Sequence, residues 1–212
     1  MAALGKKLAL GCGVTTAFFI LVELVLLAVG VVPLYERTDP YVGFSGYAPL
    51  FLKRTRSGGE PVYETAHNKL RWFNAQRFPV RKAEGTTRIF CVGGSTTYGR
   101  PYDDLTSFCG WLRLFLPAVD PSRRWEVINA GGISYASYRV ARLMEELADY
   151  EPDLFIVYSG HNEFLEKRTY DKLLKAPELV RDLGALASRL RLYSVLYDVT
   201  YDEVLPIEVK AL

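Results

Sequence analysis

A serine follows two glycines at the end of an apolar stretch, which is typical of a nucleophile on a turn that ends a strand. Residues 88–92 read Arg-Ile-Phe-Cys-Val, and Gly93 and Gly94 come directly before Ser95. Glycines let the backbone turn sharply, and α/β proteins place reactive groups at this end of a sheet. Ser95 is therefore the candidate nucleophile. The alternative is that its hydroxyl only caps the following helix or turn.

Two further stretches repeat this pattern of an apolar strand that ends in a small or polar turn. Helical spacing separates the three stretches, so they predict right-handed βαβ units in a doubly wound parallel sheet, with all three turns at one edge. From 166 to 199 only helical spacing is recognisable, so we expect the sheet to be incomplete. The predicted strands are 88–92, 125–129 and 154–158, and the predicted helices between them are 105–116 and 137–150.

The three turns together resemble the first three sequence blocks of the SGNH (GDSL-like) hydrolase superfamily. The similarity is greatest to a membrane-anchored bacterial branch and covers roughly residues 66 to 200. It implies a flavodoxin-like, three-layer α/β fold with a parallel sheet, here expected to be incomplete. The residues that carry it are Gly93-Gly94-Ser95-Thr96, Asn129-Ala130-Gly131-Gly132-Ile133-Ser134 and Gly160-His161-Asn162-Glu163.

The chemistry that the resemblance implies is acyl transfer from an ester to water or to another hydroxyl. It assigns Ser95 as the nucleophile, and the Ser95 N–H and the Asn162 amide to an oxyanion hole. A backbone N–H of the second turn completes the hole, from Ser134 or, in a shifted register, from Gly132. Fixed donors near the developing charge favour this reaction. The structural alternatives are a tight turn at Gly132 and an Asx turn at Asn162.

The base that a serine nucleophile needs is not recognisable in this sequence. The family takes it from an Asp-x-x-His block near the C-terminus, and neither His67 nor His161, the two histidines of the chain, lies in such a block. His161 is a surrogate base in one interpretation and a variable position of its turn in the other. His67 is interpreted as structural, and Glu163 as a hydrogen-bond partner that organises the third turn.

The sequence predicts neither a cofactor nor a metal site, because it contains no Cys-x-x-Cys or comparable ligand spacing. Cys91 and Cys109 are interpreted as small buried apolar residues, since a disulfide framework usually has more cysteines. The net charge of +2 includes no basic tract, which argues against nucleic-acid binding.

The N-terminal stretch predicts a transmembrane helix. Residues 8–32 contain no Lys or Arg and a single charged residue, Glu23. As a helix they extend roughly 37 Å, enough to span a bilayer. Lys6 and Lys7 favour a cytoplasmic N-terminus, a single-pass anchor in the inner membrane, and a periplasmic or extracytoplasmic C-terminal domain. A cleaved signal peptide is the alternative, although no small-x-small site follows. Glu23 marks a contact with another membrane subunit or is simply tolerated.

The chain is thus expected to contain a cytoplasmic tip and anchor (1–35), an irregular lead-in segment (36–85) and a partial SGNH-like domain (86–212). Within the lead-in, residues 71–74 and 77–80 predict a short hairpin or a lead-in arm.

Three functions fit this organisation. The first is an anchored ester hydrolase or O-acyltransferase, acting on an acylated glycan or another ester, whose base comes from elsewhere. The second is a catalytically inactive structural or assembly subunit of a membrane protein complex. The third is a ligand- or glycan-binding module, in which tyrosines near the turns stack on sugars. Those tyrosines are Tyr98, Tyr102, Tyr135 and Tyr138.

Overall fold

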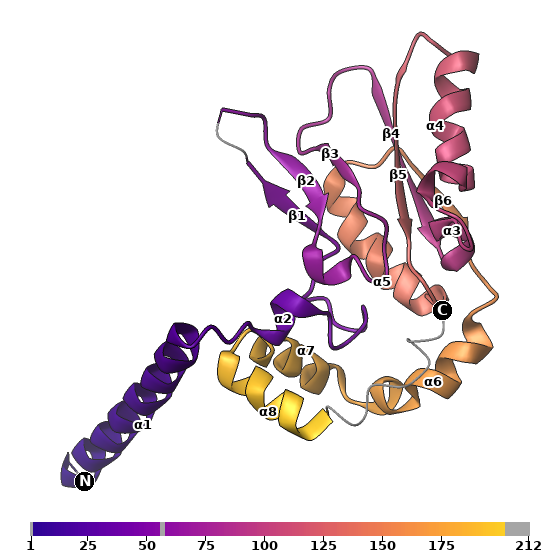
Figure 1. Ribbon diagram of the computed structural model, residues 1–212. Coiled ribbons are helices and arrows are strands. Elements are labelled where there is room, and N and C mark those ends of the chain that lie inside the picture. Colours follow the sequence, from indigo (N-terminus) through magenta and orange to yellow (C-terminus); the bar gives the residue numbers. More distant parts are fainter. Residues whose placement is uncertain (1, 56–57, 202–212) are drawn as a thin grey trace. The chain divides into compact units, whose positions relative to one another are not determined.

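The computed structural model describes residues 2–55 and 58–201 of the chain (Figure 1). Two compact units make it up. One unit runs from Tyr41 to Asp182, and the other combines the residues up to Pro40 with those from Leu183 onward.

The first unit contains a parallel sheet of three strands in the order β5-β4-β6, as the sequence predicts. Register pairs Gly93, the last residue of β4, with Gly131 of β5 and Tyr158 of β6, so all three strands end at one edge. The strands are β4 (Thr86–Gly93), β5 (Arg124–Gly131) and β6 (Leu154–Tyr158).

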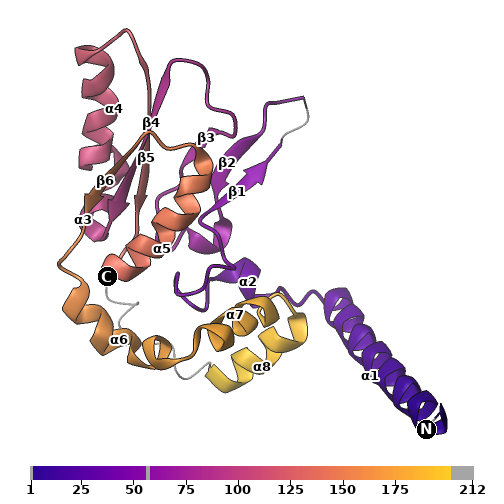
Figure 2. The same ribbon diagram turned by 180° about the vertical axis from the view of Figure 1, so that it is seen from behind.

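Helices cover both faces of this sheet (Figure 2). Val140, Leu143 and Leu147 of α5 bury against Phe90 on one face. On the other face, Cys91 packs with residues of α4. The chain is therefore a layered α/β structure. Its helical elements in this unit are α3 (Ser95–Tyr98), η2 (Asp104–Thr106), α4 (Phe108–Val119), α5 (Ser137–Leu147), η3 (Ala148–Tyr150) and α6 (Glu163–Lys175).

Part of the lead-in segment, from residue 51 to 79, contains an antiparallel sheet in the order β1-β2-β3, which the sequence did not predict. The predicted hairpin between 71–74 and 77–80 is wrong, because β3 pairs with β2 instead. Strands of three or four residues are too short for an alternating pattern to reveal. The elements are β1 (Phe51–Arg54), β2 (Val62–Thr65), η1 (His67–Lys69) and β3 (Arg77–Pro79).

The lead-in sheet and the parallel sheet share one aromatic core. Phe78 of β3 lies 5.5 Å from Phe90 of β4, measured between ring centroids, and Phe51 of β1 lies 5.0 Å from Phe78. Tyr150 joins the same cluster. The Arg88 guanidinium is fully buried beside it and donates to the Pro79 carbonyl. Burial of these rings ties the segment before residue 86 to the α/β part.

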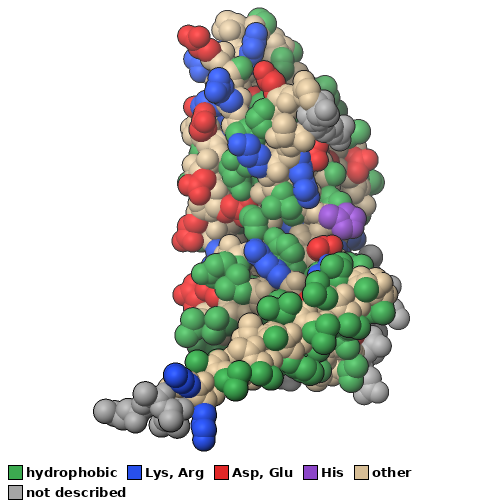
Figure 3. All heavy atoms as spheres, turned by 90° about the vertical axis from the view of Figure 1, so that its left-hand side faces the viewer, with side chains coloured by type: hydrophobic (Ala, Val, Ile, Leu, Met, Phe, Trp, Pro, Cys, Tyr) green, Lys and Arg blue, Asp and Glu red, His purple; other side chains and the backbone are tan. Residues whose placement is uncertain are grey.

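The second unit is helical. Its helix α1 (Ala2–Ala28) is, over Gly5–Ala28, long and apolar enough to cross a membrane, and its most apolar window is not buried. Figure 3 shows hydrophobic side chains gathered over this helix and Lys side chains near its N-terminal end. The helical stretch predicted beyond residue 166 is divided between α6, α7 and α8. The other helices here are α2 (Leu34–Arg37) and α8 (Arg191–Tyr201), together with the part of α7 (Glu178–Ala187) that begins at Leu183.

Candidate functional site

Ser95 is the first residue of the short helix α3, and Gly94 rather than Ser95 occupies the N-cap position. The Ser95 carbonyl accepts the N–H groups of Gly99 and Arg100, both at 3.0 Å, so the backbone of the turn is fixed. The side chain is half-buried. Within the part of the chain that the structure describes, its hydroxyl has no hydrogen-bond partner. The hydroxyl is therefore not used as a cap.

Two glycines before Ser95 are required by close packing. A Cβ atom at Gly93 would lie 2.0 Å from the Tyr158 carbonyl oxygen, and one at Gly94 would lie 2.5 Å from Nδ2 of Asn162. Only glycine lets the backbone approach so closely. The first and third turns are therefore in direct contact, and the Asn162 amide lies beside the turn that holds Ser95.

Asn162 is buried, and its Nδ2 donates to the Tyr135 carbonyl at 2.9 Å. That acceptor is 27 residues away, so the side chain bridges the third and second turns. An amide nitrogen carries two hydrogens, and the Tyr135 carbonyl takes one of them. The other hydrogen is available to a ligand.

The second turn distinguishes the two candidate backbone donors. The Gly132 N–H donates to the Gly93 carbonyl at 2.9 Å, which continues the strand pairing and occupies this group. Ser134 has a left-handed backbone with φ of 62°, and no described residue accepts its N–H. Of the two, Ser134 has the uncommitted donor.

Arg139 of α5 is hydrogen-bonded to the backbone of this turn. Its guanidinium donates to the carbonyls of Ser134, at 2.6 Å, and Val42, at 2.8 Å. Three aromatic rings surround the cation, with Tyr135 nearest at 4.2 Å from its Cζ to the ring centroid. The other two rings belong to Phe44 and Tyr170. The surrounding rings restrict the position of the guanidinium, and the guanidinium in turn restricts the position of the Ser134 carbonyl.

Asn129 is a site residue whose role the sequence pattern did not reveal. It is buried near the end of β5, and its Nδ2 donates to the Thr97 carbonyl at 3.0 Å and to Asp104 at 2.7 Å. Its Oδ1 accepts the Gly131 N–H at 3.0 Å. One side chain thus connects the first and second turns. An asparagine ending an otherwise apolar strand is the signal that points to it.

Among the described residues, neither histidine forms a hydrogen bond with Ser95. Nε2 of His161 lies 3.1 Å from Oγ1 of Thr96, and both residues are exposed. His67 is exposed on η1. Glu163 organises the turn, as expected: its carboxylate accepts the N–H and the hydroxyl of Ser137, both at 2.9 Å, at the start of α5.

The buried cysteines are unpaired by disulfides and lie under the same turn. The Cys109 thiol is 3.8 Å from the Thr97 carbonyl. A hydrogen bond with Cys109, together with burial, raises the pKa of the Cys91 thiol well above its usual range. The Cys91 thiol is therefore a packing group and not a thiolate nucleophile.

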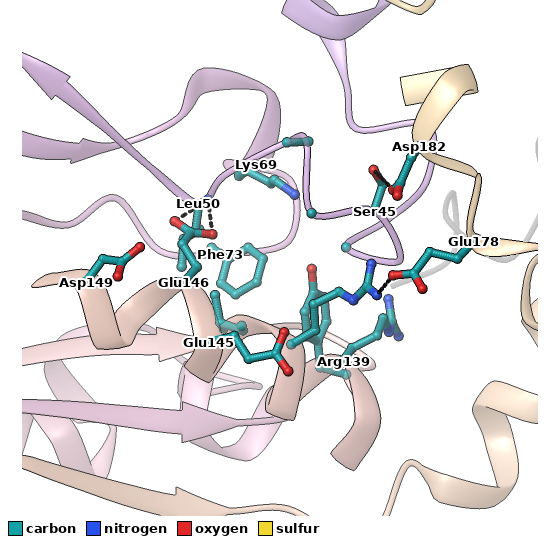
Figure 4. Close-up of a pocket in the computed structure, with 16 residues that line it drawn as sticks. Ser45, Leu50, Lys69, Phe73, Arg139, Glu145, Glu146, Asp149, Glu178 and Asp182 are labelled. Atoms are coloured by element: carbon teal, nitrogen blue, oxygen red, sulfur yellow. Dashed lines mark hydrogen bonds and ion pairs between the residues drawn. The ribbon is translucent and has the colours of Figure 1, made fainter. Parts of the chain in front are cut away.

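A cavity of about 430 Å³ lies next to the second turn but does not include Ser95 or Asn162 (Figure 4). Several of its charged side chains are paired within the protein. Glu146 accepts the Leu50 N–H at 2.9 Å, and Arg142 forms an ion pair with Glu178 that holds the pKa of that carboxyl below its usual range. This cavity is therefore a polar contact zone between the lead-in and the helices.

The four tyrosines near the turns are not equivalent. Tyr135 is buried against Phe73 and Arg139, whereas Tyr102 is 76 % exposed. They do not form one stacking platform. The described residues also contain no group of three or more His, Cys, Asp or Glu side chains that could hold a metal ion.

The fold and this site define a layered α/β protein with a serine at the strand ends. The chain matches no protein-family model, and no curated protein is significantly similar to it.

Proposed function

We propose that this chain is a membrane-anchored, extracytoplasmic serine hydrolase or O-acyltransferase of the SGNH type that acts on an acyl ester. The observation that carries the proposal is that the Ser95 hydroxyl, on the turn that ends β4, and two further donors on the neighbouring turns have no hydrogen-bond partner among the described residues. These donors are the second N–H of Asn162 and the backbone N–H of Ser134. A hydroxyl and free donors at one edge of a sheet suit acyl transfer.

In the proposed reaction, the Ser95 oxygen attacks the ester carbonyl and forms a tetrahedral intermediate. The Ser95 N–H, the Ser134 N–H and the Asn162 amide stabilise the negative charge on the former carbonyl oxygen. A base takes the serine proton and returns it to the leaving alcohol. Water, or a second hydroxyl, then attacks the acyl group on Ser95. The base takes a proton from this second nucleophile and returns it to the Ser95 oxygen as the ester bond to Ser95 breaks.

In this proposal, the base that takes the Ser95 proton is supplied by a group that does not contact Ser95 in the described structure. His161 is engaged with the neighbouring Thr96, and Glu163 is engaged with α5. A second segment or a second chain that brings a histidine to Ser95 completes the site. Ring rotation that moves His161 from Thr96 to Ser95 is the variant of the proposal that uses this chain alone.

The second candidate is a non-catalytic assembly subunit of a membrane complex. The observation in its favour is that no described histidine or carboxylate contacts the Ser95 hydroxyl. In that case the turns serve only to pack the sheet edge.

A fluorophosphonate probe separates the two candidates. Membranes that contain the full chain are treated with the probe, and labelling is compared among wild type, Ser95→Ala and Thr96→Ala. We expect Ser95→Ala to abolish labelling and Thr96→Ala, the adjacent hydroxyl, to retain it. Absence of labelling in wild type, with stable co-purification of integral membrane proteins, would support the assembly subunit.

The variant in which His161 is the base has its own test. Labelling of His161→Gln is measured in parallel. Retained labelling places the base elsewhere, and lost labelling with unchanged folding assigns it to His161.

Membrane anchoring by α1 is supported by its length and composition. Resistance of the full chain to alkaline carbonate extraction tests anchoring, and protease access from the periplasmic side tests the orientation.

A further inference from the structure

Glu23, the single charged residue within the apolar part of α1, has a partner in its own chain. Its carboxylate accepts the backbone N–H of Arg191 at 3.0 Å and that of Leu192 at 2.9 Å. Both N–H groups belong to the first turn of α8, where helical N–H groups lack intrahelical acceptors and a negative charge is favourable. The carboxylate therefore caps α8 and fixes its start against α1.

Two further bonds hold α8 to the residues that follow α1. The Arg191 side chain donates from Nε to the Val31 carbonyl at 3.1 Å. The Ser194 hydroxyl, which is fully buried, accepts the Leu34 N–H at 2.7 Å. Arg37 and Asp198 form an ion pair further along. One side of α8 is thus polar and bound to residues 31–37.

The other side of α8 is apolar and open. Leu196 is 58 % exposed, and Val199, one turn further, is 82 % exposed. Between α1 and α8 lies a groove of about 570 Å³, which we call the α1/α8 groove. Its lining is apolar apart from Glu23, Thr16 and the Tyr193 hydroxyl. The lining residues are Thr16, Phe19, Ile20, Glu23, Leu24, Ala187, Leu190, Leu192, Tyr193 and Leu196.

The position of Glu23 along α1 sets the depth of α8. Glu23 lies five residues before Ala28, the end of the helix, and this separation corresponds to about 7–8 Å along the axis. The 24-residue span is about 36 Å long, so it exceeds a hydrocarbon core of about 30 Å by about 3 Å at each end. The first turn of α8 is then about 4–5 Å inside the hydrocarbon boundary, the depth at which amphipathic helices lie in a membrane interface.

We propose that α8 lies in the membrane interface beside α1 and that a lipid acyl chain occupies the α1/α8 groove. One wall of the groove is the membrane-spanning helix itself, so the groove opens where acyl chains are the surrounding solvent. The stacked rings of Tyr193 and Tyr197 fit the same depth, because tyrosines are enriched at membrane interfaces. The inference rests on the proposed anchoring by α1 and is independent of the proposed chemistry at Ser95.

The test places an environment-sensitive fluorophore on single cysteines of the full chain in liposomes. Cys12 is replaced by serine, and Cys91 and Cys109 are fully buried, so the introduced cysteine is the site that reacts. Val199→Cys and Leu196→Cys report on α8. Val119→Cys on α4 is the matched control, because that valine is 81 % exposed. Lipids with a nitroxide near the headgroup end of the acyl chain serve as the quencher.

We expect blue-shifted emission and nitroxide quenching at Val199 and Leu196, and aqueous, unquenched emission at Val119. Quenching is the decisive readout, since burial against protein also shifts emission but does not bring the fluorophore to a lipid nitroxide. Aqueous emission at Val199 in a chain that resists carbonate extraction overturns this inference and leaves anchoring intact. Extraction of the chain by carbonate overturns anchoring as well. Efficient cross-linking of Val199→Cys between copies, without quenching, shows that a second copy covers this face and also overturns the inference.

Discussion

The Arg139 guanidinium donates to the Ser134 carbonyl at 2.6 Å, and Ser134 is one of the few non-glycine residues with a positive φ. A left-handed backbone costs a non-glycine residue about 1–3 kcal/mol and persists when the surroundings impose it. Here the arginine binds the Ser134 carbonyl and so restrains the backbone that carries the free N–H of the same residue. The oxyanion donor proposed for Ser134 therefore depends on a cation buried beneath the turn.

Replacement of Arg139 tests this dependence. Arg139→Lys keeps the charge and loses the planar group that reaches two carbonyls at once, so we expect probe labelling of Ser95 to slow by about ten-fold to a hundred-fold. The matched control is Arg142→Lys on the same helix, whose guanidinium binds Phe44 and Glu178 instead. Equal labelling rates in the two variants would show that Arg139 does not position the site.

Asn129 is expected to be essential for the turn that holds Ser95. Asn129→Ala removes donors to Thr97 and Asp104 and leaves the buried Gly131 N–H without its acceptor, which costs about 1–3 kcal/mol of unfolding free energy. Asn129→Asp has nearly the same shape but directs a carboxylate oxygen at those acceptors, so we expect it to be the less stable of the two. Thermal unfolding of the detergent-solubilised chain measures the order, and the reverse order contradicts the assigned network.

A methyl group at Gly93 is expected to separate β4 from β6. The Tyr158 carbonyl, 2.0 Å from the position of that methyl group, is backbone and cannot rotate away. We expect Gly93→Ala to destabilise the chain by about 1–3 kcal/mol or more. Gly46→Ala is the control, because a Cβ there meets no atom within 4 Å. Unfolding midpoints that are the same for both variants would refute the packing argument.

Loss of the Glu23 carboxylate is expected to loosen the first turn of α8. Glu23→Leu keeps α1 apolar but removes the acceptor of the Arg191 and Leu192 amides, and loss of such a cap costs about 0.5–2 kcal/mol. Amide hydrogen exchange at these two residues should then accelerate by roughly a factor of 2–30. Glu36→Gln in α2 is the control, since Glu36 is exposed. Unchanged exchange in Glu23→Leu would rule out the cap.

Titration of Asp153 is expected to account for part of the loss of stability at acid pH. Hydrogen bonds from the Lys82 side chain and the Arg88 N–H hold the pKa of Asp153 below its ordinary value of 3.8. A carboxyl whose pKa is lower in the folded state adds stability above the unfolded pKa and loses it as pH falls through the folded pKa. Asp153→Asn should therefore reduce stability at neutral pH and flatten its loss below about pH 4. The effect is small, because the side chain is 39 % exposed. Unfolding midpoints from neutral pH to pH 2 measure it.

The three parallel strands were predictable because each is largely an apolar run between turn residues, and the observed strands extend beyond the predicted ones by two residues at most at either end. The lead-in sheet was not, because its strands are short and its aromatic residues alternate with proline and glycine. The polar residues that support the site were not predictable either. Nothing in a local pattern distinguishes the buried Arg88 and Arg139 from the many exposed arginines, since the acceptors they bind lie in other elements.

The hydroxyl, the carboxamide and the second turn were located from sequence, but their hydrogen-bond states were not. Whether Gly132 or Ser134 has a free N–H depends on the register between β4 and β5, which the residues alone leave open. The partner of Glu23 was not predictable from sequence either, because it is supplied by a helix more than 160 residues later in the chain.

The aromatic core shared by Phe51, Phe78, Phe90 and Tyr150 has a consequence for biosynthesis. The lead-in sheet leaves the ribosome before the parallel sheet, yet its rings have no cover until β4 and the end of α5 are synthesised. During that interval a hydrophobic surface is exposed, so the two sheets acquire stability together in one cooperative step. A chain shortened to start at residue 86 would lack half of that aromatic cluster and should be recovered as insoluble aggregate.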